Sequence, residues 1–350
     1  MALDFATIAL AFLLVIIAFI AVEITLRAFP NVLPTQIKYV LILDYDKELL
    51  WKLKPSADVE YTNTDGNLYR VKTYPFETPS LQDKEIGFRD NNIPDSPEVV
   101  AFGDSFTFGD ENSFEDTWPY ALQSKLGKRV VNLGITGYSQ LQEEAIARRY
   151  VSKLKPKVAL LGFFANDYGG DYDFSKITPF SYRISFFGSN LLSVRWVKMT
   201  LLGQNENLKL VKYNVSGGDA QYLYNQEKTQ EFFSTALPYF TEGGKLSRES
   251  VLRMREMLKG SRFIVLLIPP KEWHYRDILP YPDVEYNAIL DTMRRHLEEN
   301  NIEFIDAREG FEKARKEGKH IYTNHGSHLS REGNALLADI VSEHLKRNST

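Results

Sequence analysis

From residue 98 onward the chain alternates short apolar runs with longer amphipathic segments. The apolar runs predict buried strands near residues 98–103, 129–133, 158–163, 263–268 and 303–306. Apolar residues three or four positions apart predict helices over residues 140–154, 284–299 and 331–345. Strands that are apolar on both faces are expected to be parallel and covered by helices on each side. The pattern therefore predicts the α/β class, with a doubly wound, flavodoxin-like parallel sheet of about five strands.

The first thirty residues have a different pattern. Residues 5–22 are apolar at every position except Thr7, which predicts a helix about 27 Å long. The stretch has neither the polar stripe of a buried soluble helix nor the basic start and small-residue site of a cleaved signal. We expect an uncleaved single-pass anchor. Arg27 and Lys38 follow it, so the positive-inside count alone would place the large domain in the cytoplasm.

Between the anchor and the first long strand, short alternating runs are broken by turn residues. Val59-Glu60-Tyr61 and Leu68-Tyr69-Arg70-Val71 flank an Asn-Thr-Asp-Gly-Asn turn, a pattern that favours β-hairpins. We divide the chain into an anchor (1–30), a β-rich appendage packed on the core (31–95) and a core domain (96–350). An aromatic-rich insertion at about 168–250 interrupts that domain. It could form a lid, an acyl-chain groove, a membrane-facing surface or a small helical subdomain.

Composition narrows the classes of function. The net charge of −4 comes from 46 acidic and 42 basic residues without a long run of either sign, so no nucleic-acid partner is predicted. The absence of cysteine excludes disulfides, thiol catalysis and a lipobox anchor. His325 and His328 have a spacing that metal ligands can have, but no acidic residues around them complete a set, and we predict neither a metal nor a cofactor.

Polar residues follow three of the predicted strands. The strand near 98–103 ends in Gly103-Asp104-Ser105, which would expose a serine hydroxyl at a tight turn as a candidate nucleophile. The next two strands end near Gly137 and Asn166, and the carboxyl ends of parallel strands meet at one edge of the sheet. Near the C-terminus, a polar loop before a helix carries two histidines. Together these segments supply a nucleophile, oxyanion donors and a base.

In these four segments the chain resembles the SGNH subgroup of the GDSL hydrolase superfamily, over roughly residues 95–345. The resemblance implies that Ser105 is the nucleophile and His328 the general base. It also implies an oxyanion hole made of the Ser105 and Gly137 N–H groups and the Asn166 amide. We therefore expect a serine esterase that forms an acyl-enzyme.

Two positions depart from that family's pattern. Phe164 stands where a glycine usually precedes the block asparagine, and His325 stands where an aspartate usually orients the catalytic histidine. Ser105 and His328 could work as a dyad with Asn324 or a backbone carbonyl orienting the ring, or a carboxylate such as Asp306 could come from elsewhere. The site could also be weak or inactive, because losing the orienting carboxylate costs about 10⁴ in the serine-protease template.

The expected substrate is an acylated glycan or lipid, with O-acetyl as one candidate acyl group. An O-acyltransferase using the same residues and a non-catalytic, membrane-tethered glycan-binding module are the alternatives. Asp104 and Lys271 lie near the predicted ligand edge as possible orienting or substrate contacts. Relatives of this kind often act outside the cytoplasm, so the resemblance favours an extracytoplasmic domain, against the charge count.

Overall fold

The computed structural model describes residues 5–202, 208–215, 218–225, 239–274, 284–324 and 326–347. Its centre is a five-stranded sheet in the order β13-β12-β9-β7-β8, and every neighbouring pair is parallel. Counted along the chain this is the order 2-1-3-4-5 of flavodoxin-like folds, which confirms the predicted fold class. The strands are β7 (Val99–Phe102), β8 (Val130–Asn132), β9 (Val158–Phe164), β12 (Arg262–Ile268) and β13 (Glu303–Asp306).

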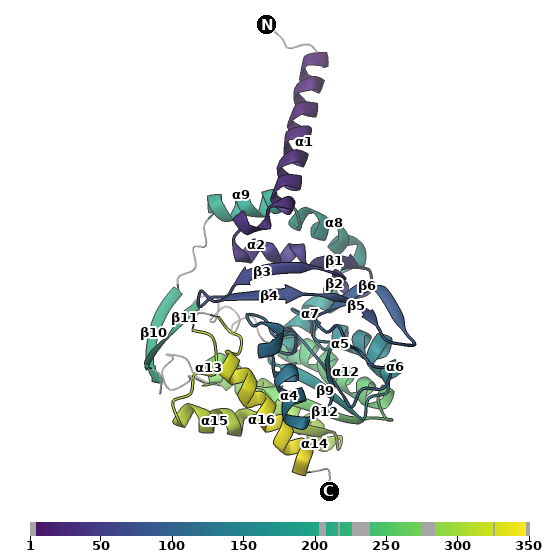
Figure 1. The fold of residues 1–350 in the computed structure, drawn as a ribbon, viewed down its shortest axis with the longest axis vertical. Helices are drawn as coiled ribbons and strands as arrows, with labels where there is room; N and C mark the ends of the chain where they lie inside the picture. The colour runs from purple at the N-terminus through teal and green to yellow at the C-terminus, as the bar shows by residue number, and fades with distance from the viewer. Residues whose placement is uncertain are drawn as a thin grey trace.

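Helices cover both faces of this sheet (Figure 1). On one face, side chains of α5, α12 and α14 join the core with alternate strand residues such as Val100 and Phe102. On the other face, α4, α15 and α16 pack on the intervening residues, such as Val99 and Ala101. The bounds are α4 (Trp118–Leu126), α5 (Gln140–Ile146), α12 (Gly244–Met257), α14 (Val284–Glu299), α15 (Arg308–Lys316) and α16 (Arg331–Arg347).

The helix predicted over 140–154 is continuous but not uniform. It begins as α5, passes through a π-helical stretch at Ala147–Val151 and ends as α6 (Ser152–Leu154). Ser139 begins it with a capping box in which the Gln142 side chain bonds back to the Ser139 backbone. This cap fixes where the chain leaves the loop after β8.

The appendage consists of three antiparallel hairpins, as the turn pattern predicts. They are β1 (Leu43–Asp46) with β2 (Leu50–Leu53), β3 (Asp58–Thr62) with β4 (Leu68–Lys72), and β5 (Tyr74–Glu77) with β6 (Gln82–Phe88). Short helices α2 (Thr35–Lys38) and η2 (Tyr39–Leu41) lead into them. Buried appendage residues such as Tyr61 and Phe88 belong to the same apolar core as the sheet. The appendage is therefore packed on the core domain.

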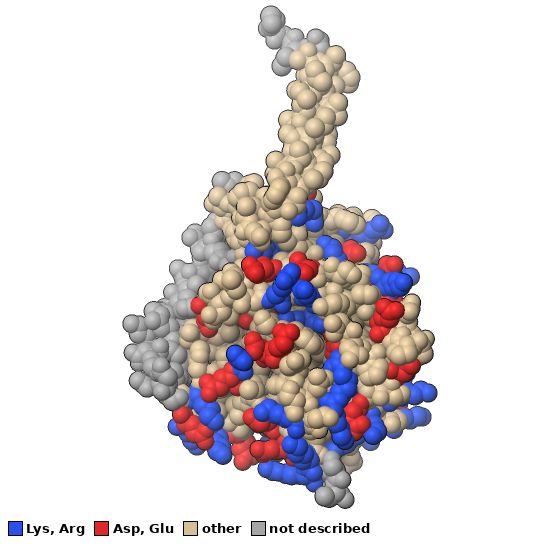
Figure 2. Space-filling view, in the orientation of Figure 1, with Lys and Arg blue, Asp and Glu red and all other residues tan. Residues whose placement is uncertain are grey.

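The segment predicted to be an anchor forms the helix α1 (Phe5–Ala28), which projects alone from the body (Figures 1 and 2). It is long and apolar enough to cross a membrane. At its foot lie α8 (Pro179–Ser189) and α9 (Leu192–Leu202), which belong to the aromatic-rich insertion (Figure 1). The insertion also contains α7 (Asp167–Lys176), a hairpin of β10 (Leu208–Val215) and β11 (Gly218–Asn225), and a π-helical turn at Tyr239–Gly243 before α12.

Candidate active site

The serine after β7 lies at the start of a four-residue helix, α3 (Ser105–Phe108). Asp104 precedes it as the N-cap, and its carboxylate accepts a hydrogen bond of 2.9 Å from the Phe106 N–H. Gly103 has φ +154°, and a Cβ atom there would lie 2.5 Å from Thr107 Oγ1. Glycine is therefore required for the turn that carries Ser105.

Ser105 and His328 meet although they lie 223 positions apart in the sequence. His328 Nε2 lies 3.0 Å from Ser105 Oγ, within hydrogen-bond distance. Ser105 is only 8% exposed. The imidazole also packs against Phe106, with ring centroids 5.3 Å apart. Ser105 Oγ and His328 Nε2 thus have the separation that proton transfer between them would require.

A carboxylate that the sequence analysis did not select lies beside the histidine. Glu111 Oε1 is 3.5 Å from His328 Nδ1, the ring nitrogen on the side away from Ser105. Nδ1 is buried and makes no hydrogen bond within the described residues. A second acid, Asp110, places Oδ2 3.8 Å from His328 Nε2. Both acids lie a short way after Ser105 on the chain, in the run Gly109-Asp110-Glu111.

These carboxylates determine the charge balance of the imidazole. Burial by itself lowers the pKa of His328, but the contact with Glu111 and the charges of Asp110, Glu111 and Asp104 outweigh it, so the pKa lies above its usual value. Burial likewise acts to raise the pKa of Glu111, yet the contacts with His328, Thr323 and Thr64 lower it below its usual value. Glu111 is therefore a carboxylate near neutral pH and favours the protonated imidazole.

Glu111 is held in an unusual backbone conformation. Its φ is +65°, in the left-handed region that costs a residue with a side chain about 1–3 kcal/mol and that persists only where surrounding contacts enforce it. The β3–β4 turn supplies two such contacts: Asn63 Nδ2 donates to the Glu111 carbonyl at 3.2 Å, and Thr64 Oγ1 donates to Glu111 Oε2 at 2.9 Å. The same turn reaches the histidine loop, since Asp65 Oδ2 accepts the Asn324 N–H at 2.9 Å.

Arg89 bonds the backbone on either side of Asp110 and Glu111. Its buried guanidinium donates to the carbonyls of Phe108, Gly109 and Asn112, and lies 4.9 Å from the centroid of the Phe108 ring. Asp110 is fixed separately: Tyr39 Oη and Thr136 Oγ1 donate to its two oxygens at 2.7 and 2.5 Å. Both acids are therefore held by hydrogen bonds from residues outside their own loop.

Gly137 and Asn166 lie at the carboxyl ends of β8 and β9, where the parallel sheet would place them. Gly137 has φ +76° and is backed by Trp51 of β2, whose indole N–H donates to the Thr136 carbonyl at 3.2 Å. Asn166 begins α7 with an exposed side chain that makes no hydrogen bond within the described residues. The next residue, Asp167, accepts the Phe164 N–H at 3.0 Å and so closes the turn.

Phe164, which replaces the glycine usual at its position, stacks on Phe106 with ring centroids 4.1 Å apart. The larger side chain is thus accommodated against the residue that follows the nucleophile. The structure gives it a packing role beside the site.

The other candidates have different surroundings from those expected. Lys271 is fully buried and donates to the carbonyls of Thr323, Asn324 and Gly326, so it clamps the histidine loop and does not face a substrate. Burial lowers its pKa to about 7. Asp306 forms an ion pair with Arg308 at 2.6 Å and has none with His328 among the described residues. Therefore Asp306 does not orient the imidazole.

The remaining candidates are Asp104, Asn324 and His325. Asp104 is 1% exposed and caps α3, so it is not a substrate contact, although its charge acts on His328. Asn324 bonds through its backbone to Asp65 and Lys271. His325 lies outside the described residues. Within those residues no group of three or more potential metal ligands occurs.

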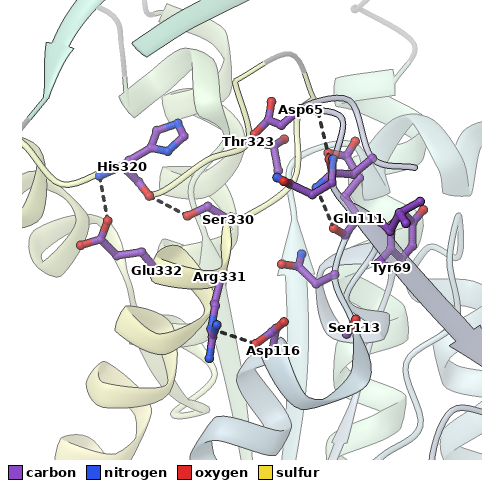
Figure 3. Close-up of a pocket in the computed structure, with 14 residues that line it drawn as sticks. Asp65, Tyr69, Glu111, Ser113, Asp116, His320, Thr323, Ser330, Arg331 and Glu332 are labelled. Atoms are coloured by element: carbon purple, nitrogen blue, oxygen red, sulfur yellow. Dashed lines mark hydrogen bonds and ion pairs between the residues drawn. The ribbon is translucent and has the colours of Figure 1, made fainter. Parts of the chain in front are cut away.

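A polar cavity of about 360 Å³ lies behind Glu111, between the β3–β4 turn and the start of α16 (Figure 3). Tyr69 and Asp65 line it from the hairpin, and Asp116, His320 and Arg331 line it from the core domain (Figure 3). Arg331 Nε donates to Asp116 at 2.9 Å across the opening. Glu111 lines this cavity, whereas Ser105 and His328 are not among its lining residues.

Comparison with known proteins adds a family match. The model of the GDSL-like lipase/acylhydrolase family matches residues 101–336. No curated protein sequence matches the chain significantly.

Similar solved structures include the following three. A lipolytic G-D-S-L protein from Veillonella parvula has 13% identity and a TM-score of 0.42, with 71% of this chain and 98% of that one covered. An acetyl xylan esterase has 16% identity and a TM-score of 0.43, with 71% and 99% covered. A lipase/acylhydrolase from Enterococcus faecalis has 14% identity and a TM-score of 0.43, with 71% and 95% covered.

Proposed function

Because the chain belongs to the GDSL-like lipase/acylhydrolase family and is an ester-bond hydrolase, we propose that it is a membrane-anchored serine esterase that removes a short acyl group from a glycan or lipid. The observation that carries the proposal is the 3.0 Å approach of His328 Nε2 to Ser105 Oγ.

In the proposed reaction His328 Nε2 takes the Ser105 proton while Oγ bonds to the ester carbonyl carbon. The carbonyl oxygen becomes an oxyanion, held by the N–H groups of Ser105 and Gly137 and by the Asn166 amide. The intermediate collapses with loss of the alcohol, which takes the proton from His328 and leaves an acyl-serine. Water then attacks the acyl carbon with His328 again as base, which releases the acid and restores Ser105.

Glu111 is the proposed positioning residue for His328. A carboxylate at Nδ1 selects the tautomer with a free Nε2 and stabilises the imidazolium formed in each proton transfer. The 3.5 Å contact is long for a hydrogen bond, and catalytic contacts of this kind often tighten only once substrate is bound. With Glu111 in this role, neither a Ser105–His328 dyad nor an acid in the histidine loop is needed.

The membrane assignment rests on α1. Its most apolar stretch of 18 residues has a mean hydropathy of 3.0. None of that stretch is buried in the body, whereas the core helix of a soluble protein is mostly buried. We infer from this that α1 anchors the protein. That the domain lies outside the cytoplasm is proposed from the resemblance to hydrolases that often act there, and not from α1. Labelling of a cysteine introduced at Lys346 by a membrane-impermeant maleimide in intact cells tests that side, because the natural chain has no cysteine. Labelling only after the cells are lysed would place the domain inside.

The activity is tested on the full-length chain in detergent. A fluorophosphonate probe should label the parent protein once, as read by intact mass, and should label neither Ser105→Ala nor His328→Ala at a comparable rate. Asn166→Ala should still be labelled but should turn over acetyl esters more slowly. A folded parent protein that resists the probe and hydrolyses no acetyl ester would refute the proposal and favour a binding module. Acyl transfer to an added sugar without net hydrolysis would instead identify an acyltransferase.

A further inference from the structure

The helix α8 is apolar on two opposite faces. Tyr182 and Phe186 face the body, where they contact Trp51 and Tyr45 with ring centroids 5.9 and 6.2 Å apart. A second stripe at spacings of four and three residues faces outward and is 75%, 62% and 58% exposed: Phe180, Ile184 and Phe187. One apolar stripe is enough to hold a surface helix on its core. The outer stripe therefore lacks a structural role within the described part of the chain.

The helix α9 continues this apolar surface. Val194, Trp196 and Val197 are 43%, 40% and 56% exposed. We call these three residues, together with Phe180, Ile184 and Phe187, the collar. A cluster of large exposed apolar side chains of this kind marks an interaction site in most soluble domains.

The collar has a fixed place at the foot of α1. Glu23 of α1 accepts hydrogen bonds from the Leu192 and Ser193 N–H groups at 3.0 Å each, and Arg27 donates to the Asn190 carbonyl at 2.7 Å. Leu26 and Leu192 share one small buried cluster. Figure 1 shows α9 crossing the foot of α1 and α8 on the other side of it, and Figure 2 shows uncharged atoms over α1 and over the shoulder beside it. The collar thus begins where the apolar span ends.

The charges of the segment match an anionic surface. Residues 177–202 contain Arg183, Arg195 and Lys198 but no aspartate or glutamate. Aromatic and aliphatic side chains together with basic ones are typical of helices that lie in the headgroup region of a bilayer. Basic residues there contribute about 1 kcal/mol each on an anionic membrane.

From these observations we propose that α8 and α9 lie in the headgroup layer of the membrane that α1 spans, and that the collar inserts into its outer edge. The proposal rests on the anchor under the proposed function. An anchor alone would leave the body free to swing about the end of α1. Contact through the collar would hold the body in one orientation, with the active site facing a fixed direction relative to the lipid surface.

The test uses the full-length chain, which has no natural cysteine and so accepts a single fluorescent label. Ile184→Cys and Val197→Cys report on the collar, and Leu14→Cys reports on the anchor. Leu68→Cys is the matched control, because Leu68 is an apolar residue that is 68% exposed and lies on β4. Each variant is labelled with an environment-sensitive dye, checked for retained esterase activity and reconstituted into phosphatidylcholine–phosphatidylglycerol vesicles that carry nitroxide lipids.

We expect the collar labels to lose most of their emission to nitroxides near the headgroup, the Leu14 label to nitroxides near the chain ends, and the Leu68 label to neither. If the Leu14 label is quenched and the collar labels are not, the proposal that the collar inserts is refuted, while the proposal that α1 spans the membrane stands. Quenching at the collar without quenching at Leu14 would support the collar and refute a spanning anchor. Absence of quenching at every position would refute both.

Discussion

Glu111→Gln tests whether the acid beside the nucleophile does the work usually done by an acid in the histidine loop. The change removes one charge 3.5 Å from His328 Nδ1 while keeping the shape of the side chain. At an effective dielectric constant of about 20, two unit charges at that distance attract by about 5 kcal/mol. Asp110 stays 3.8 Å from Nε2 and still stabilises the imidazolium, so part of that attraction remains. We expect kcat to fall about 10²- to 10³-fold, at about 1.4 kcal/mol for each factor of ten.

The pH profile separates this role from a merely structural one. Glu111 raises the pKa of His328, so its loss should move the acidic limb of kcat/KM to lower pH. Acetyl-ester hydrolysis is measured across the pH range for the parent, Glu111→Gln and Glu111→Asp, with urea unfolding as the check on stability. Glu115→Gln is the matched control, because Glu115 is exposed on the same segment. An unchanged acidic limb and kcat in folded Glu111→Gln would refute the reasoning.

Three further predictions concern the same site. Asn166→Ala should lower kcat about 10²- to 10³-fold with little change in stability, because it removes one oxyanion donor whose side chain is exposed; an unchanged kcat would remove Asn166 from the hole. Lys271→Met should destabilise the fold by about 1–3 kcal/mol in urea unfolding, because the carbonyls it bonds lose their buried donor, and equal stability would contradict the clamp. Burial raises the pKa of Asp104 to about 7, so the folded state still holds this proton at pH values where the unfolded state has released it. The free energy of unfolding therefore falls as pH rises toward 7. Asp104→Asn, which can still cap α3, should make the free energy of unfolding less dependent on pH over that window, and an unaltered slope would contradict it.

The sheet could be predicted from the sequence because its strands are apolar on both faces. Each of the five runs forms a strand within one or two residues of its predicted bounds, and the helix over 284–299 begins and ends where predicted. Periodicity could not show the π-helical stretch at Ala147–Val151, since only the three helical residues Ser152–Leu154 follow it, too few to reveal a shift in the apolar pattern. Nor could it place α8 and α9 at the foot of α1, because the hydrogen bonds to Glu23 join residues about 170 positions apart.

The sequence predicts those candidate site residues that belong to a recognisable motif. Ser105, Gly137, Asn166 and His328 each follow a recognisable strand or loop signal. Glu111 has no such signal, since an acid six residues after the nucleophile resembles any solvated turn residue. Its position depends on a left-handed backbone conformation and on donors from a distant hairpin, neither of which is encoded locally. The buried Arg89 has no sequence signal either, because its partners are the backbone carbonyls of residues 19 to 23 positions away.

Residues 31–95, the appendage, contribute several hydrogen bonds to the candidate site. Thr64 bonds the Glu111 carboxylate, Asp65 the histidine loop, Tyr39 the Asp110 carboxylate, and Trp51 the carbonyl before Gly137. These four contacts join residues 31–95 to three loops of the site: the loop after Ser105, the loop before Gly137 and the histidine loop. If Glu111, in the loop after Ser105, orients His328, then the histidine loop does not supply its own orienting acid. The two loops must then be held at a constant distance by residues outside both of them. The β3–β4 turn does this because it bonds both loops at once, so the departure at His325 and the presence of the appendage are parts of one arrangement.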